Sequence, residues 1–349
     1  LRYLGFSIED LASHASFEEV AYLLLLGELP NKGNLEQFEN ELLELRTMPK
    51  SLVDVVESIP SEAHPMEVVR TIISYMGVIE PEKTFDDQLS VSKRLLGVTT
   101  TAIVYWYKYS HEGVRINQET GEKSVAAHFL KLLRQEDIQD LHKKTLDVSL
   151  TLYAEHEFNA STFTGRVCAS TLSDLHSCLT AAVGSLRGPL HGGANEKVVS
   201  MLSKIDSKDD IRPWLDDTLK AKNVVWGMGH REYSVKDPRA NILTDMVQEL
   251  FNEREGGVTD IFEKAIELEK ACEEKLAHKG VYPNVDFYSG ILYKEMDIPT
   301  DIFTPIFAMS RVSGWLSHWI EQIQDNKIFR PTQNYVGSDD RDYTDISGR

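Results

Sequence analysis

Three short segments of the sequence place an acid–base side chain beside glycine or proline. They are Gly188-Pro-Leu-His191-Gly-Gly, Gly227-Met-Gly-His230 and Pro283-Asn-Val-Asp286. Glycine lets a ligand approach the backbone, and both residue types are common at helix ends. Two imidazoles and a carboxylate can remove a proton from carbon and stabilise the enolate that results. The pattern favours an enzyme that joins carbon to carbon.

His191 lies where one helix is expected to end, at Gly188-Pro189, and the next to begin, within residues 192–196. The positive end of a helix dipole and free amide groups disfavour a charged imidazolium there. A neutral imidazole can donate a hydrogen bond to a developing enolate oxygen. The alternative is a histidine that only caps a helix.

His230 lies in a turn that gathers positive charge. Asp237-Pro238-Arg239 follows it and supplies a helix N-cap, a proline at the first helical position and an arginine in the first turn. The third glycine of a dinucleotide-binding fingerprint is absent, so Gly227-Met-Gly229 indicates phosphate binding only weakly. A surface loop is the alternative.

Asp286 precedes an expected helix over residues 287–296, and Tyr282, Phe287 and Tyr288 flank it. Partial desolvation among aromatic rings would raise the pKa of the carboxyl group and make it a better general base. The alternative is an aspartate that only caps the helix.

Two arginines near the end of the chain suit an anionic ligand. Arg311 falls in the apolar stretch 302–320, where a buried guanidinium needs an anion or a carboxylate partner. Arg330 precedes Pro331, and the alternative interpretation of this residue is a charge exposed to solvent. Guanidinium groups bind carboxylates in a bidentate manner, so two or three of them could hold a dicarboxylate.

His156 stands between Glu155 and Glu157 in the segment 153–162. Adjacent helical residues point to different sides, and the HExxH pattern is absent, so we expect no metal site. A ligand-binding histidine with Asn159 nearby is one interpretation, and a buried polar residue is the other.

Composition limits the class of protein. The chain has 349 residues, 42% of them hydrophobic, and a net charge of −18, which argues against nucleic acid and anionic membranes as partners. No apolar run is long enough to span a bilayer. The three cysteines form no CxxC pair, which favours a reducing, cytoplasmic location. The first residue is Leu1 rather than Met, so we expect sequence upstream.

Helix signals dominate the pattern. Ser16-Phe-Glu-Glu19 is a capping box, and Gly27 is suited to end the helix that it opens. Apolar residues recur at helical spacing near residues 35–45, 175–186 and 262–276. Strand signals are few: a hairpin around residues 114–121 and an extended tail near Tyr335-Val336. We expect a nearly all-α protein.

Taken together, the three segments resemble the catalytic segments of the citrate synthase family, and the likeness covers essentially the whole chain. The matching residues are 188–196, 229–230 with 237–239, and 283–286. The resemblance implies an all-α, two-domain fold. A large helical domain would comprise about 1–192 and 301–349, and a small mobile helical domain about 193–300 would close over substrate.

Several stretches look most like bacterial 2-methylcitrate synthases within the family. They are residues 63–70, 105–111, 153–163, 325–331 and 334–337. This likeness implies condensation of propionyl-CoA with oxaloacetate, with acetyl-CoA as a further substrate, and hydrolysis of the thioester to 2-methylcitrate or citrate. Coenzyme A thioester would be a substrate, and no cofactor is implied.

The resemblance also implies a role for each candidate residue. Asp286 would take the α-proton, His191 would stabilise the enolate, and His230 would polarise the oxaloacetate carbonyl and protonate the new alkoxide. The residues implied to bind or line the oxaloacetate site are His156, Asn159, Arg239, Phe307, Arg311 and Arg330. The enzyme would be a homodimer in which Arg330 reaches the site of the partner subunit.

Arg187, Arg231 and Lys236 are candidates for the CoA phosphates. One departure from the family pattern is Glu232, two residues after His230, where a small apolar residue is usual. A carboxylate near CoA phosphates would weaken their binding unless it points away from the site.

Three other functions stay open from sequence. A citrate synthase of the tricarboxylic acid cycle that prefers acetyl-CoA differs by only one methylene in the substrate, which is worth about 1–3 kcal/mol of discrimination. A helical scaffold without chemistry would tolerate loss of His191 and Asp286. A metal-dependent hydrolase needs a cluster of ligands that the sequence does not display.

Overall fold

The computed structural model describes residues 1–349 except residues 231, 254–257 and 339. The side chain of residue 253 also lies outside the described part. The prediction of an all-α protein is confirmed. The first helices are α1 (Ile8–His14), α2 (Phe17–Leu26), α3 (Lys32–Leu45), α4 (Lys50–Ser58), α5 (Pro65–Ile79), α6 (Gln88–Glu112), α7 (Val125–Arg134) and α8 (Asp140–Tyr153). The others are α9 (Ala160–Ala169), α10 (Leu175–Leu186), α11 (Ala194–Leu202), α12 (Ile211–Lys220), α13 (Pro238–Glu253), α14 (Asp260–Leu276), α15 (Val285–Glu295) and α16 (Phe303–Gln324).

Local sequence sets several helix ends as predicted. At the start of α2 the Ser16 side chain accepts a hydrogen bond from the Glu19 amide, and the Glu19 carboxylate accepts one from the Ser16 amide. Gly27 ends α2 in the left-handed conformation, with φ 86°. Glycine adopts this conformation without the steric cost that a Cβ brings, which is why it ends helices so often.

The prediction of a hairpin around residues 114–121 is wrong. Residues 113–123 form no strand, whereas β1 (Arg2–Tyr3) and β2 (Phe6–Ser7) pair antiparallel at the start of the chain. The turn between them places Leu4 at φ 45° and Gly5 at φ 91°. Two positive φ values in a two-residue loop match the twist of a hairpin, so Gly5 was the available signal.

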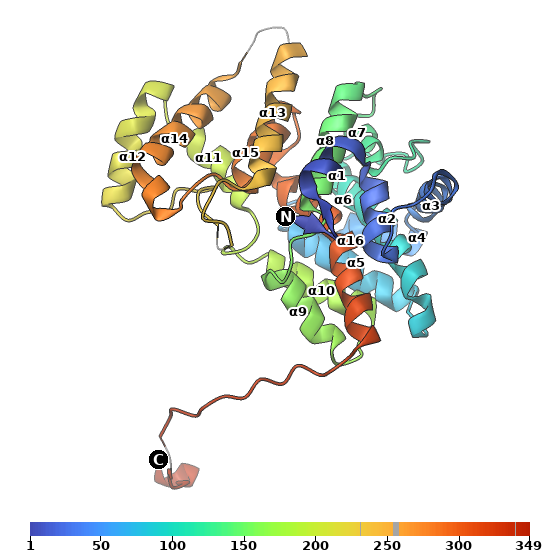
Figure 1. Ribbon diagram of the computed structural model, residues 1–349. Helices are drawn as coiled ribbons and strands as arrows, with labels where there is room; N and C mark the ends of the chain where they lie inside the picture. The colour runs from blue at the N-terminus through green and yellow to red at the C-terminus, as the bar shows by residue number, and fades with distance from the viewer. Residues whose placement is uncertain (231, 254–257, 339) are drawn as a thin grey trace.

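The helices form two groups, which give the two-domain arrangement (Figure 1). Helices α11 to α15 gather on one side, and α1 to α10 pack around α16 on the other. Helix α16 is buried on nearly all sides, with Trp315 and Trp319 at its centre. A helix that is apolar all round belongs inside a core, and α16 accordingly contacts α2, α5, α6, α8, α9 and α10. The boundaries predicted at about residues 192 and 300 stay a prediction.

After α16 the chain leaves this body as an extended tail (Figure 1). Residues 326–338 and 340–345 form neither helix nor strand, in line with the extended tail expected near Tyr335. Apolar side chains along it are exposed, and Val336 is 95% exposed.

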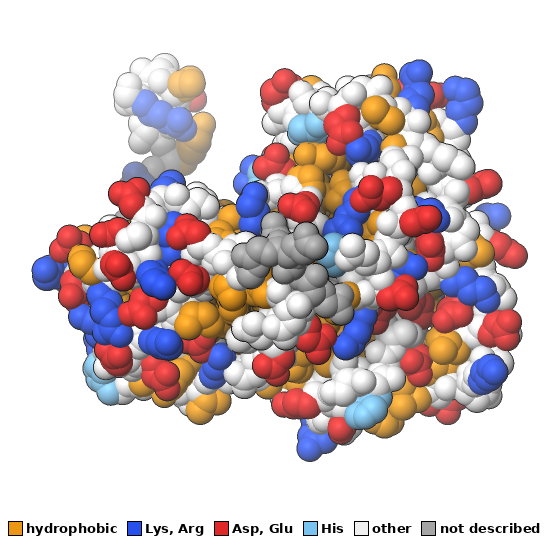
Figure 2. Space-filling model, turned by 90° about the horizontal axis from the view of Figure 1, so that it is seen from above, with side chains coloured by type: hydrophobic (Ala, Val, Ile, Leu, Met, Phe, Trp, Pro, Cys, Tyr) orange, Lys and Arg blue, Asp and Glu red, His pale blue; other side chains and the backbone are white. Residues whose placement is uncertain are grey.

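Charges of both signs are interspersed over the face shown in Figure 2, although the sequence as a whole is acidic. Within the described residues, no helix combines the length and the apolar character needed to cross a bilayer.

Candidate active site

Backbone pairing holds two of the three predicted catalytic segments together. Met228 and Pro283 form an isolated antiparallel bridge, and the Gly229 amide donates to the carbonyl of Tyr282 at 2.7 Å. The Asn284 side chain donates to the carbonyl of Gly229 at 2.9 Å. A Cβ on Gly227 would lie 2.9 Å from Cα of Phe287, so the close approach requires glycine. His230 and Asp286 are therefore positioned as one unit.

Asp286 is the second residue of α15, and Asn284 is the N-cap, so the reading of Asp286 as a capping residue is wrong. The Tyr153 hydroxyl of α8 donates to Asp286 Oδ1 at 2.7 Å. Burial raises the pKa of the Asp286 carboxyl, while the Tyr153 hydrogen bond and the charges of Arg239 and Arg311 act to lower it. The predicted effect of desolvation is confirmed, and a raised pKa suits a general base.

His191 lies between α10 and α11, two residues before the N-cap Gly193. Its Nε2 lies 3.2 Å from the Ser161 backbone amide and 2.8 Å from the Ser161 hydroxyl. Because the amide can only donate, Nε2 is assigned as an acceptor and the ring proton to Nδ1. Burial and, secondarily, the charge of Arg311 lower the pKa of His191 to about 4. A neutral ring with a free Nδ1–H is the form that can donate to an enolate oxygen.

His230 takes the opposite tautomer. Its Nδ1 accepts from the Glu232 backbone amide at 3.1 Å, which leaves Nε2–H as the donor. Burial and then the charge of Arg239 lower the pKa of His230. The Glu232 side chain is exposed, so the carboxylate that departs from the family pattern lies on the surface.

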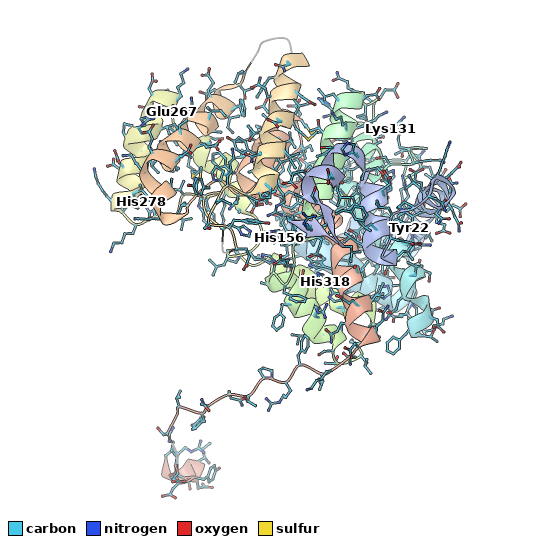
Figure 3. The ribbon with its side chains drawn as sticks, in the orientation of Figure 1. Tyr22, Lys131, His156, Glu267, His278 and His318 are labelled. Carbon is cyan, nitrogen blue, oxygen red and sulfur yellow. The ribbon has the colours of Figure 1, made fainter. Side chains whose placement is uncertain are left out.

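His156 is buried and touches His230, with ring centroids 5.1 Å apart. Its Nε2 lies 3.0 Å from the Tyr233 hydroxyl. Burial, followed by the charges of Arg239 and Arg311, lowers the pKa of His156 to about 2, so the ring is neutral. His156 lies between the two groups of helices, far from Tyr22 and His278 at the edges (Figure 3).

Two buried arginines stand beside these histidines. Arg239 is 2% exposed and binds Asp237 through two contacts, Nε to Oδ1 at 3.0 Å and Nη2 to Oδ2 at 2.7 Å. Arg311 is 1% exposed, and its Nε donates to the carbonyl of Tyr153 at 2.5 Å. Among the described residues, no carboxylate oxygen lies within 4.0 Å of the Arg311 guanidinium nitrogens. Burial lowers the pKa of Arg311, and the charge of Glu155, which acts on Arg311 without forming an ion pair, raises that pKa against the effect of burial.

Four of the predicted residues lie around two buried charges, those of Arg311 and Arg239, and His156 and Asp286 feel both. Arg311 influences His191, His156 and Asp286, and Arg239 influences His230, His156 and Asp286. The Arg311 guanidinium carbon lies 4.7 Å from the centroid of the Phe307 ring. The centroids of the Phe307 and Tyr153 rings are 4.6 Å apart. The site thus draws His156, His191 and Arg311 from one group of helices and His230, Arg239 and Asp286 from the segment 193–300.

Comparison with known proteins identifies the family. A family profile described as "Citrate synthase, C-terminal domain" matches residues 1–332. The 2-methylcitrate synthase of Shewanella oneidensis is 45% identical over 100% of this chain and 92% of its own length. The chain belongs to the citrate synthase family. The citrate synthase of a Synechocystis species is nearly as similar to this family member, at 43% identity over 100% of this chain and 88% of its own length.

A solved citrate synthase has the same fold. The enzyme of the archaeon Thermoplasma acidophilum, in a ternary complex with carboxymethyl coenzyme A and oxaloacetate, superposes on this citrate synthase family chain with a TM-score of 0.93. The two sequences are 31% identical, and the match covers 100% of this chain and 93% of that one. The predicted family and fold class are both confirmed.

Two candidates of this family member differ from the others: Asn159 lies next to His156, and Arg330 lies in the tail. Asn159 is the N-cap of α9, and its side chain binds the Thr162 amide, the Ser161 and Thr162 hydroxyls and the His156 carbonyl. All its hydrogen-bonding capacity serves the helix end, so it shapes the site rather than pointing a free group at it. Arg330 is exposed in the tail, where its Nη1 donates to the Pro331 carbonyl at 2.8 Å.

Two of the proposed CoA residues, Arg187 and Lys236, are partly exposed cations with carboxylate partners. Arg187 lies 3.3 Å from Glu67, and Lys236 lies 2.5 Å from Glu269. Arg231 lies outside the described residues. The three residues stay predictions for CoA binding.

Sequence reasoning missed three residues that contact the candidates. Ser161 binds His191, Tyr233 binds His156, and Tyr153 binds Asp286. Tyr153 and Ser161 lie within the segment 153–162 around His156, and Tyr233 lies close after His230, so proximity in the sequence was a usable signal for His156 and His230. Tyr153 is 133 residues from Asp286, and no local pattern links them.

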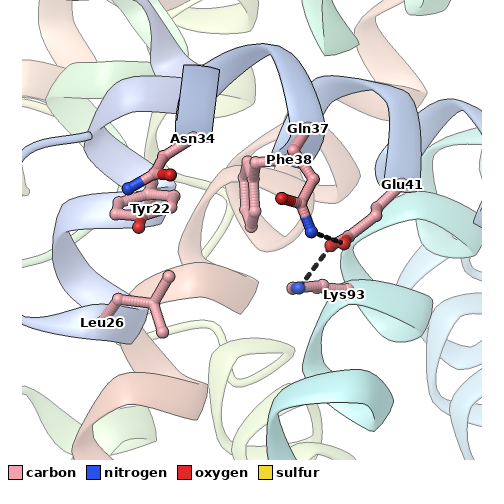
Figure 4. Close-up of a pocket in the computed structure, with 7 residues that line it drawn as sticks. All are labelled: Tyr22, Leu26, Asn34, Gln37, Phe38, Glu41 and Lys93. Carbon is pink, nitrogen blue, oxygen red and sulfur yellow. Dashed lines mark hydrogen bonds and ion pairs between the residues drawn. The ribbon is translucent and has the colours of Figure 1, made fainter. Parts of the chain in front are cut away.

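No group of three or more potential metal ligands occurs among the residues that the structure describes. A separate pocket of about 140 Å³ lies between α2, α3 and α6 (Figure 4). It is remote from the site, since Tyr22, which lines it, is far from His156 in Figure 3. Its Lys93 is already paired with Glu41, so we assign it no part in the chemistry.

Proposed function

We propose that the protein is an acyl-CoA:oxaloacetate C-acyltransferase that condenses propionyl-CoA, and also acetyl-CoA, with oxaloacetate. The observation that carries the proposal is that two neutral histidines, each with one ring N–H to donate, and one carboxylate meet at one place. His191 offers Nδ1–H, His230 offers Nε2–H, and the carboxyl group of Asp286 has a raised pKa. Each group matches one need of enolate chemistry.

In the proposed reaction Asp286 takes the α-proton of the thioester, and the electron pair becomes an enolate whose oxygen accepts from His191. The α-carbon attacks the ketone carbon of oxaloacetate, and His230 gives its proton to the alkoxide. Water then hydrolyses the thioester and releases CoA with 2-methylcitrate or citrate. An acid or base in position typically contributes about a hundredfold to ten-thousandfold.

Arg239 and Arg311 would hold the oxaloacetate carboxylates, with His156 beside them and Arg330 supplied by the partner subunit of a homodimer. The site draws residues from both sides of the 192/193 boundary, which supports closure of the segment 193–300 over substrate. Closure would exclude water and strengthen each hydrogen bond to the enolate.

The alternative is a citrate synthase that prefers acetyl-CoA, favoured by the 43% identity to the Synechocystis enzyme. Release of free CoA thiol from acetyl-, propionyl- and butyryl-CoA with oxaloacetate, with mass spectrometry of the products, separates the two. Substantial turnover of propionyl-CoA to 2-methylcitrate is expected. Undetectable turnover of propionyl-CoA with rapid citrate formation would leave only the alternative.

A further inference from the structure

Helices α8 and α15 are joined by two buried pairs of hydroxyl groups. The Ser149 and Tyr293 oxygens lie 2.6 Å apart, and the Tyr153 and Ser289 oxygens lie 2.7 Å apart. The partners are four residues apart on each helix, so they lie one turn apart on one face. Their order is reversed between the helices, which therefore run antiparallel. These pairs join the segment 193–300 to the rest of the fold.

Only one of these pairs continues to the candidate base. Asp286 lies three residues before Ser289 on α15, and its Oδ1 is 2.7 Å from the Tyr153 hydroxyl. Burial raises the pKa of Tyr153 well above 10, so the phenol keeps its proton. A phenol has one proton to give and an ionised carboxylate has none, so Tyr153 donates to Asp286 and accepts from Ser289.

The two oxygens of Asp286 are therefore not equivalent. Oδ1 accepts from Tyr153, and no hydrogen bond from the described residues reaches Oδ2. A charge-assisted hydrogen bond from a buried, packed phenol restricts rotation of the carboxyl group. The Tyr153 ring is held in turn by Phe307, and its carbonyl oxygen is bound by Arg311.

We propose that Tyr153 is a positioning residue for proton abstraction, which fixes Asp286 through Oδ1 and presents Oδ2 to the substrate α-carbon. The inference rests on the proposed role of Asp286 as the base. In this step the C–H proton moves to Oδ2, the C–H electron pair enters the enolate, and Tyr153 keeps its own proton. The product is a neutral carboxylic acid that still accepts from the phenol.

The same contact governs the pH at which the base works. Among the described residues, the charged and titratable groups that face Asp286 are Tyr153, Tyr293, Arg239, Asp237 and Arg311, and the Tyr153 hydrogen bond is the largest influence that lowers its pKa. Removing the phenolic hydrogen therefore raises the pKa of Asp286. The base acts when ionised, so the acidic limb of kcat/KM against pH must move to higher pH.

The test compares Tyr153→Phe with the matched variant Tyr293→Phe. Each substitution removes one buried hydroxyl from the same pair of helices, but only the first removes a donor to Asp286. We expect Tyr153→Phe to move the acidic limb upward and to lower kcat at low pH by about tenfold, the effect of one hydrogen bond to a charged group. The KM of Tyr153→Phe for oxaloacetate should equal that of the parent protein. The acidic limb of the pH profile should not move in Tyr293→Phe.

The inference would be overturned if the acidic limb of the pH profile does not move in Tyr153→Phe, or if it moves equally in Tyr153→Phe and Tyr293→Phe. Tyr153 would then have only a structural role. Should Tyr153→Phe not fold, Ser289→Ala provides the test, because loss of the hydrogen bond to Tyr153 weakens its donation in the same direction. An unchanged limb in Ser289→Ala would then count against the proposal. Asp286→Asn, assayed in parallel, separates the two claims: full activity there removes the base itself.

Discussion

The guanidinium of Arg239 and the carboxylate of Asp237 form a bidentate ion pair in which both side chains are buried. Removing one partner of a buried pair leaves an uncompensated charge. We expect Asp237→Ala to lower the free energy of unfolding by about 3–5 kcal/mol, measured by urea denaturation. The matched control is Asp54→Ala at the exposed pair with Lys50, where a change within about 0.5 kcal/mol is expected. Equal effects at both sites would contradict the importance of burial.

Asp286→Asn should lower turnover by at least about a hundredfold, because the amide cannot take the proton from carbon. The amide oxygen can still accept from Tyr153, so the thermal unfolding midpoint should stay close to that of the parent protein. Steady-state assays and calorimetry of the same preparation measure both quantities. Turnover near the parent rate would remove Asp286 from the role of base.

Arg311→Met should separate stability from binding. The cation is buried and has no carboxylate partner among the described residues, so the expected cost in stability is about 1–3 kcal/mol, from the Tyr153 carbonyl that loses its donor. The KM for oxaloacetate should rise by about tenfold to a hundredfold, because a charged hydrogen-bond donor to the dianion is lost. A strongly destabilised protein with an unchanged KM would point to a structural arginine instead.

Arg330 offers a test of a shared site. Its side chain lies in the exposed tail of its own subunit, so we expect it to act across a dimer interface. Mixing Arg330→Ala with Asp286→Asn subunits creates mixed dimers with one intact site, and random mixing should restore roughly a quarter of the sites. No recovery, in subunits shown to exchange, would place Arg330 outside the partner's site.

Acid should destabilise the protein partly through His128. This residue is buried between Thr101 and Thr120, 2.9 Å and 2.8 Å from their hydroxyls, and burial lowers the pKa of His128 from 6.5 to about 3. Above pH 6.5 both states are neutral. As the pH falls, the unfolded chain takes up a proton that folded His128 does not, so stability decreases toward pH 3.

The variant His128→Gln keeps groups that can bond both threonines and removes this titration. Between pH 7.5 and pH 5 it should lose about 2 kcal/mol less stability than the parent protein, compared by urea unfolding at one protomer concentration. An identical loss in both proteins would show that other groups govern the acid sensitivity.

Local sequence was most informative where the physics is local. The capping box at Ser16 and the left-handed Gly27 follow from neighbouring residues alone, and so does the place of Arg239 in the first turn of α13. The hairpin lies at Gly5 and not near Gly121, because a short strand pair is set by its turn and Gly5 supplies the positive φ that the turn needs.

The site was predictable only as a set of parts. The motifs named His191, His230 and Asp286, and the His230 tautomer depends on the amide of the nearby Glu232. The His191 tautomer depends on the Ser161 amide, which only the folded chain brings to it. The contact between Tyr153 and Asp286 joins residues 133 positions apart. Such pairings arise from helix packing, which a single sequence does not display.

The bridge between Met228 and Pro283 has a mechanical consequence. It ties His230, the proposed proton donor for the alkoxide, to Asp286, the proposed acceptor of the α-proton, so neither can be displaced without the other. A rigid-body rotation of the segment 193–300 would therefore bring His230 and Asp286 to the substrate at the same time. The reverse rotation would withdraw both when the product leaves.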